Sequence, residues 1–104
     1  MNEPRTIAWI FYALELASGK ESADFRSISE LADGINHAAP THKEIQSSLS
    51  WLSEKGFVVK SERKYLITAI GKSVLSSAHT GATTTSQVLA QLTQTIEVLS
   101  EKKL

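Results

Sequence analysis

The sequence contains no cysteine, only two prolines and no excess charge of either sign, with 11 Lys and Arg against 11 Asp and Glu in 104 residues. Without cysteine the chain has no disulfide framework and no thiolate zinc site. An apolar content of 41% excludes a disordered or collagen-like chain and favours one ordinary folded domain. The lack of net positive charge removes the simplest argument for a nucleic-acid partner.

No apolar run in the sequence is long enough to cross a membrane. The longest run, from Ile7 to Leu16, is interrupted by Tyr12 and Glu15 and is far shorter than the roughly 20 residues of a spanning helix. An acidic residue inside the run also argues against a secretion signal. We therefore expect a cytoplasmic protein that has no membrane partner.

Two segments with helical periodicity open the chain. The first spans residues 4–18 and is followed by Gly19, which offers a left-handed stop. A short second helix is expected to begin at Ser27, because the string SISE matches a capping box in which Glu30 is the partner of Ser27. The two apolar stripes are Ile7, Ile10, Phe11 and Leu14 in the first helix, and Ile28, Leu31, Ala32 and Ile35 in the second.

A second capping box, THKE, predicts that a third helix begins at Thr41 with Glu44 as its partner. This helix should end at Gly56, and its apolar face comprises Ile45, Leu49 and Leu52. The β-rich runs FVV and YLI follow, separated by the charged string KSERK, and together they predict a small hairpin.

The last part of the chain returns to helical spacing at TAIGKSVLSSA and then at residues 85–104, where Thr84 is the expected cap. We expect residues 1–78 to form one domain, residues 79–84 a linker and residues 85–104 a dimerisation helix. The final helix carries an apolar stripe at heptad spacing. Its residues are Val88, Leu89, Leu92, Ile96 and Leu99. We favour pairing of two copies through this stripe, and the alternative is packing against the chain's own first helix.

Two strings resemble bacterial winged helix-turn-helix transcriptional regulators of the MarR and PadR type. The first, LSWLSEKGFV, matches a pattern carried by Leu49, Leu52, Gly56, Phe57 and Val58, and the second, YLITAIG, one carried by Tyr65, Thr68 and Gly71. The resemblance implies a mainly α fold with a small β-hairpin (α+β). It also implies a regulator, such as a repressor, that binds duplex DNA as a homodimer.

In that plan the third helix enters the major groove and the hairpin touches the flanking backbone. At about 100° per residue, the helix face opposite Ile45 is polar and suited to base edges or phosphates. Helix N-termini also receive phosphates well. The candidate DNA-binding residues are Lys43, Gln46, Ser47 and Ser50 on that face, Thr41 and Ser27 at helix starts, and Lys60, Arg63 and Lys64 in the hairpin. The alternative is an ordinary solvated surface.

The neutral total conceals an uneven distribution of charge along the chain. Residues 1–39 carry three basic and six acidic side chains, a net charge of −3, whereas residues 40–72 carry six basic and three acidic, a net charge of +3. The basic segment coincides with the predicted third helix and hairpin. A local patch of this size predicts modest, salt-sensitive DNA affinity for each copy, so useful affinity would need two copies.

We find little in the sequence that supports catalysis. The histidines His37, His42 and His79 are not spaced as metal ligands, and the pair Gly71 and Lys72 lacks the glycine-rich loop of a phosphate binder. We therefore expect no enzyme, no metal and no cofactor, and leave open whether a small-molecule effector binds. The second functional hypothesis is a winged helix used for protein contacts, as an adaptor or an antagonist of another regulator.

Overall fold

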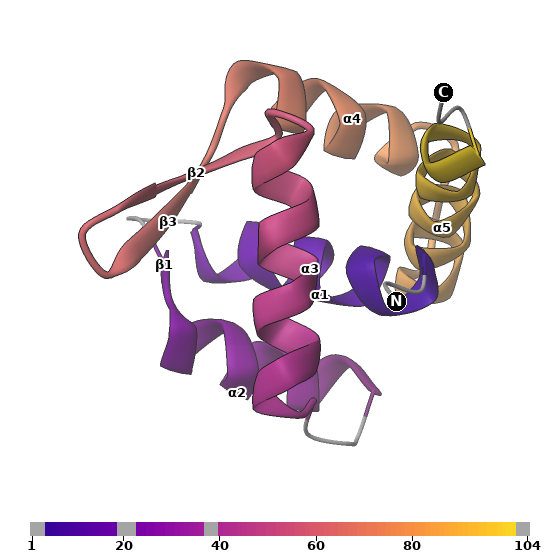
Figure 1. Cartoon of the computed structure of the whole chain (residues 1–104). Coiled ribbons are helices and arrows are strands. Elements are labelled where there is room, and N and C mark those ends of the chain that lie inside the picture. The colour runs from indigo at the N-terminus through magenta and orange to yellow at the C-terminus, as the bar shows by residue number, and fades with distance from the viewer. Residues whose placement is uncertain (1–3, 19–22, 37–39, 102–104) are drawn as a thin grey trace.

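The computed structural model describes residues 4–18, 23–36 and 40–101, which form a mainly helical fold with a small antiparallel sheet. The elements run in the order α1 (Pro4–Ala17), β1 (Ala23–Asp24), α2 (Phe25–Asn36), α3 (His42–Glu54), β2 (Val58–Ser61), β3 (Lys64–Ile67), α4 (Ala69–His79) and α5 (Thr85–Glu101). In Figure 1, α3 stands in front of α1 and α2, with the hairpin on its left and α5 on its right. None of the helices in the described ranges is long and apolar enough to cross a membrane.

Helix α1 is the centre of the core and packs against α2, α3 and α5. The predicted stripe of this helix is fully buried, as are Ala8 and Ala13. Burial on more than one face explains why α1 needs small residues between its large ones, since three helices approach it. The α1 prediction is therefore confirmed, whereas Gly19, its expected stop, lies outside the described residues, as do residues 37–39 before α3.

Helix α2 begins at Phe25 and its cap is Asp24, three residues before the cap Ser27 that the SISE string predicts. The Asp24 carboxylate accepts hydrogen bonds from the backbone N–H and the hydroxyl of Ser27, both at 2.8 Å. Glu30 does not close a capping box there and instead faces the exposed Arg26 across 3.4 Å. A carboxylate at the N-cap satisfies a free N–H and also interacts favourably with the helix dipole, which explains why Asp24 takes this position.

Helix α3 begins and ends where the sequence predicts. The Thr41 hydroxyl accepts from the Glu44 N–H at 3.0 Å, and the Glu44 carboxylate accepts from the Thr41 N–H at 2.8 Å. At the other end Gly56 has φ +81°, and the Phe57 N–H donates to the Leu52 carbonyl at 3.0 Å. This is a Schellman ending, in which a left-handed residue turns the chain out of the helix.

The end of α3 is joined directly to the start of α4. Thr68 is the N-cap of α4, as its side chain accepts from the Gly71 N–H, and its hydroxyl donates to the Gly56 carbonyl at 2.6 Å. The Thr68 N–H also donates to the Phe57 carbonyl at 2.9 Å. The two strings that carry the family resemblance are therefore hydrogen-bonded to each other, and these bonds close the base of the hairpin.

The sheet has the order β1-β3-β2, and all its strands are antiparallel. The predicted hairpin is present and turns through the two residues Glu62 and Arg63, since Ser61 pairs with Lys64. Strand β1, only two residues long, was not predicted, because a strand this short has no periodicity to detect. It pairs Ala23 with Tyr65 and so attaches the hairpin to the start of α2.

Helix α5 packs onto α1 and α4 of the same chain. Val88, Leu92 and Ile96 are 4%, 0% and 0% exposed within the common core, and Leu89 and Leu99 pack against its edge. The structure therefore differs from the favoured expectation and corresponds to the alternative, in which the stripe covers the chain's own first helix. The physical reason is that α1 has an apolar surface left over by α2 and α3, and α5 is close enough to bury it.

Candidate nucleic-acid interface

Helix α3 has one face in the core and one open to solvent. Ile45, Leu49 and Leu52 are at most 2% exposed, whereas the predicted contact residues Lys43, Gln46 and Ser50 are exposed and Ser47 is half-buried. In Figure 1 no other element of the described residues lies over the front of α3. The face that sequence periodicity assigned to a partner is thus free, with its donors and acceptors in a single row along the helix.

A groove of about 350 Å³ separates this helix face from the hairpin. Three predicted contact residues line it together, with Gln46 and Ser50 coming from α3 and Lys60 from β2. Four further residues complete the lining, namely Leu49, Ser53, Glu54 and Tyr65. Glutamine can pair with adenine through both groups of its amide, and lysine can meet guanine or a phosphate, so the groove holds side chains suited to a nucleic acid.

Lys60 has a defined direction within the groove. It is the cross-strand partner of Tyr65, and its ammonium nitrogen lies 5.8 Å from the centroid of the Tyr65 ring. A cation at this distance from an aromatic face is held by the ring quadrupole without being neutralised. The sequence pattern places Lys60 in the charged string between the two β-rich runs, so its pairing with Tyr65 is evident only in the structure.

The other two basic residues of the hairpin lie at its tip. Arg63 and Lys64 are exposed and line a separate hollow of about 530 Å³ with Ser61, Glu62 and Leu66. Lys64 is the strand partner of Asp24, and the two charges interact. The pKa of Asp24 is lowered chiefly by the hydrogen bonds from the Ser27 N–H and hydroxyl, and further by the positive charge of Lys64. Part of the Lys64 charge is therefore already balanced within the chain.

At both helix N-termini that were predicted to bind phosphates, a carboxylate of the chain itself accepts a hydrogen bond. Glu44 accepts from the backbone N–H of Thr41, and Asp24 accepts from Ser27. These acidic groups satisfy free N–H groups and oppose the positive end of the helix dipole. Thr41 is exposed, but Ser27 is half-buried and its hydroxyl is turned to Asp24. Among the predicted contact residues, the structure thus brings those of the α3 face and the hairpin together, whereas Ser27 is not part of this group.

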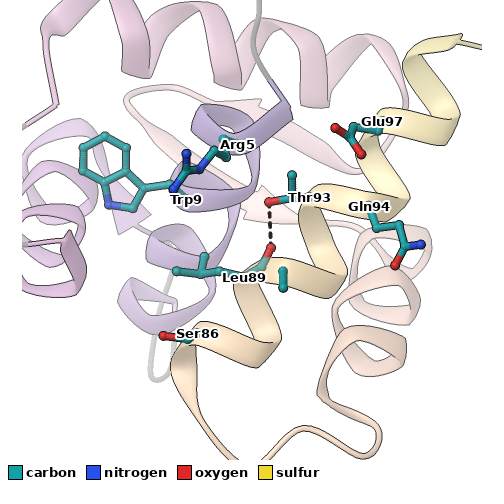
Figure 2. Close-up of a pocket in the computed structure, with 8 residues that line it drawn as sticks. Arg5, Trp9, Ser86, Leu89, Thr93, Gln94 and Glu97 are labelled. Carbon is teal, nitrogen blue, oxygen red and sulfur yellow. Dashed lines mark hydrogen bonds between the residues drawn. The ribbon is translucent and has the colours of Figure 1, made fainter.

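A second groove, of about 590 Å³, runs between α1 and α5 on another side of the molecule. Arg5 and Trp9 of α1 line this groove together with α5 residues, among them Leu89 and Glu97, and Figure 2 shows the Trp9 indole ring directed away from α5. The Trp9 indole N–H donates to the Ala32 carbonyl at 2.8 Å, which ties α1 to α2. Of the five residues predicted for dimerisation, Leu89 lines this groove, Val88, Leu92 and Ile96 are buried in the core, and Leu99 is half-buried against the core.

Comparison of the chain with known protein families, curated proteins and solved structures finds no match. The candidate site therefore rests on the chain's own geometry. Within the described ranges no three His, Cys, Asp or Glu side chains come together in a way that could hold a metal ion.

Proposed function

We propose that this chain is a winged helix-turn-helix protein that binds duplex DNA through α3 and the hairpin and acts as a transcriptional regulator, in its simplest form a repressor. The order of elements supports this proposal. Three helices, a short strand between the first two, and a hairpin after the third follow the plan in which the third helix enters the major groove. Strand β1 also attaches the hairpin to α2 on the side of the molecule away from α5.

The observation that carries the proposal is the groove shared by Gln46, Ser50 and Lys60. A helix face alone is most often only solvated, but here two α3 side chains and a hairpin lysine converge from separate elements. In the proposed complex the outward row of α3 contacts base edges, while Lys60 and Arg63 contact the flanking phosphates. The net charge of +3 on residues 40–72 supplies the electrostatic attraction.

We further propose that two copies bind each site. The net charge of +3 on residues 40–72 allows each copy only a few phosphate contacts. Two copies related by a two-fold axis on a symmetric operator would make twice as many. The buried residues Val88, Leu92 and Ile96 are not available to a second copy, so the contact between copies must involve other surface residues.

Selection of duplexes from a random pool, followed by fluorescence anisotropy across a salt series, tests this function. We expect an enriched two-fold symmetric sequence whose affinity falls as salt rises from 50 to 200 mM. Lys60→Ala should weaken binding to all duplexes alike and reduce the salt slope by about 1, whereas Gln46→Ala should relax preference at one base position. Arg5→Ala, which removes an equal charge on α1, outside both the groove and the basic segment 40–72, is the control. Affinity insensitive to salt and to Lys60→Ala would refute the proposal.

A second candidate is a winged helix used for protein contacts, and one observation favours it. Val59 and Leu66 are cross-strand partners on the outward face of the hairpin and are 47% and 41% exposed, and nearby in sequence Ile70 is 60% exposed. Exposed apolar residues in a cluster are typical of protein interfaces. The same selection distinguishes the two functions, since a chain of this second kind enriches no duplex at any salt concentration.

A further inference from the structure

Lys55, at the C-terminal end of α3, is a basic residue to which the α3 groove gives no role. It is the C-cap of the helix and is exposed. Its ammonium nitrogen lies 5.5 Å from the centroid of the Trp51 ring, one turn earlier on the helix. Among the residues that the structure describes, Lys55 forms no ion pair. An aromatic face holds a lysine without neutralising it, so Lys55 is a positioned cation whose charge is available to a partner.

The Trp51 ring is itself fixed by the core. It is half-buried and packs edge-on against the ring of Phe57, with the two centroids 6.2 Å apart. Phe57 is 5% exposed and stacks on Phe11 of α1 at 6.0 Å. Side chains packed against a core occupy single rotamers, because the interior is close-packed. Trp51 therefore offers Lys55 a stationary face, and the direction of Lys55 depends on the tertiary structure.

Lys55 and Trp51 lie on the flank of α3 that is turned away from the hairpin. When angles are measured from the buried Ile45, Gln46 lies at about 100°, Trp51 at about 240° and Lys55 at about 280° around the helix axis. Gln46 lines the groove that it shares with Lys60 of the hairpin. The outward row of α3 is therefore bordered by Lys60 on one side and by Lys55 on the other.

The two flanking lysines match the geometry of a duplex. A helix in the major groove stands between two sugar–phosphate backbones, one on each side of a groove about 12 Å wide. When the outward row of α3 enters that groove, the hairpin flank faces one strand and the opposite flank faces the complementary strand. Each flank carries a lysine held over an aromatic ring, Lys60 at 5.8 Å from Tyr65 and Lys55 at 5.5 Å from Trp51.

We propose that Lys55 binds a phosphate on the strand opposite to the one that Lys60 contacts, within the half of the operator bound by one copy. Trp51 is the positioning residue for this contact. The contact rests on the proposed function, since it belongs to the same DNA site. An ammonium group that is already held in place loses less freedom when it meets a phosphate, which favours binding.

Fluorescence anisotropy with a duplex enriched from the random pool measures the contribution of Lys55. Lys55→Ala should weaken binding about tenfold at about 0.1 M salt and reduce the salt slope by about 1, the effect of one lost phosphate contact. Lys55→Arg retains the charge and should restore the slope. Trp51→Leu removes the ring but not the charge, so it should weaken binding about two- to fivefold with the slope unchanged. Circular dichroism confirms that each variant is folded.

Methylphosphonate linkages, each of which removes the charge of a single phosphate, identify the strand. We expect Lys55→Ala to cause no further loss of affinity when one linkage on one strand is neutral, and Lys60→Ala to behave in the same way for a linkage on the other strand. A purely structural lysine would instead weaken every duplex equally. Coupling of both lysines to the same strand, or affinity reduced by Lys60→Ala but not by Lys55→Ala, would overturn this inference and leave the proposed function standing. If no duplex is enriched, the proposed function fails and the inference fails with it.

Discussion

Gly71 in the first turn of α4 lies directly against the carbonyl oxygen of Phe57 at the base of the hairpin. A Cβ atom at position 71 would overlap that oxygen and would also stand 2.9 Å from Cγ2 of Ile67. The neighbour is backbone and is held by the hydrogen bond from the Thr68 N–H, so it cannot move aside cheaply. The close approach explains why the string YLITAIG ends in glycine.

We expect Gly71→Ala to destabilise the chain by about 1–3 kcal/mol or more, as overpacking of a fixed site does. Gly34→Ala is the matched control, because Gly34 lies in helix α2 with nothing within 4 Å of an added Cβ. That change should stabilise the chain by about 0.5–1 kcal/mol. Urea unfolding followed by circular dichroism measures both, and equal effects of the two substitutions would contradict the assigned contact.

Leu92→Ala should destabilise the chain by about 2–5 kcal/mol, because Leu92 is fully buried against the chain's own core. Gln94→Ala, on the exposed side of the same helix, should change stability by no more than about 0.5 kcal/mol. Light scattering of the folded variants should give the same mass as the unaltered chain. A stable Leu92→Ala protein whose mass has halved would instead show that this residue lies between two copies.

Asp24 should make the chain sensitive to acid. Its pKa is lowered in the folded state, first by the Ser27 N–H, so its contribution to stability is present above its unfolded value of 3.8 and is lost as pH falls through the lower folded value. Asp24→Asn retains an N-cap but cannot titrate. We therefore expect the unaltered chain to lose more stability than Asp24→Asn in denaturant titrations between pH 5 and pH 2. Parallel pH profiles would contradict this role.

The turn of the hairpin contains a strained residue. Glu62 has φ +58°, a left-handed conformation that costs a side-chain-bearing residue about 1–2 kcal/mol. Glu62→Gly should therefore stabilise the chain by up to about 1 kcal/mol in thermal or urea unfolding. Arg63→Gly should give no such gain, since Arg63 does not have a positive φ. A loss of stability on Glu62→Gly would mean that its side chain makes a contact worth more than the strain.

Local signals predicted the elements that depend on neighbours in sequence. The Thr41 capping box, the left-handed Gly56 and the Thr68 cap were all readable, because each involves atoms within a few residues of one another. The cap of α2 was placed wrongly, since Ser27 and Asp24 are both good caps and periodicity does not choose between them. Strand β1 ends at Asp24 and the helix begins at the next residue, so Asp24 is the residue in the cap position.

The sequence by itself determined the amphipathic helices, the position of the hairpin and the polar face of α3, since apolar spacing and capping chemistry act over one or two turns of chain. Only the tertiary structure decided that Val88, Leu92 and Ile96 cover α1 of the same chain, and that Lys60 meets Gln46 and Ser50 in one groove. An apolar stripe records that a surface must be buried but not against what, because the hydrophobic effect has no direction.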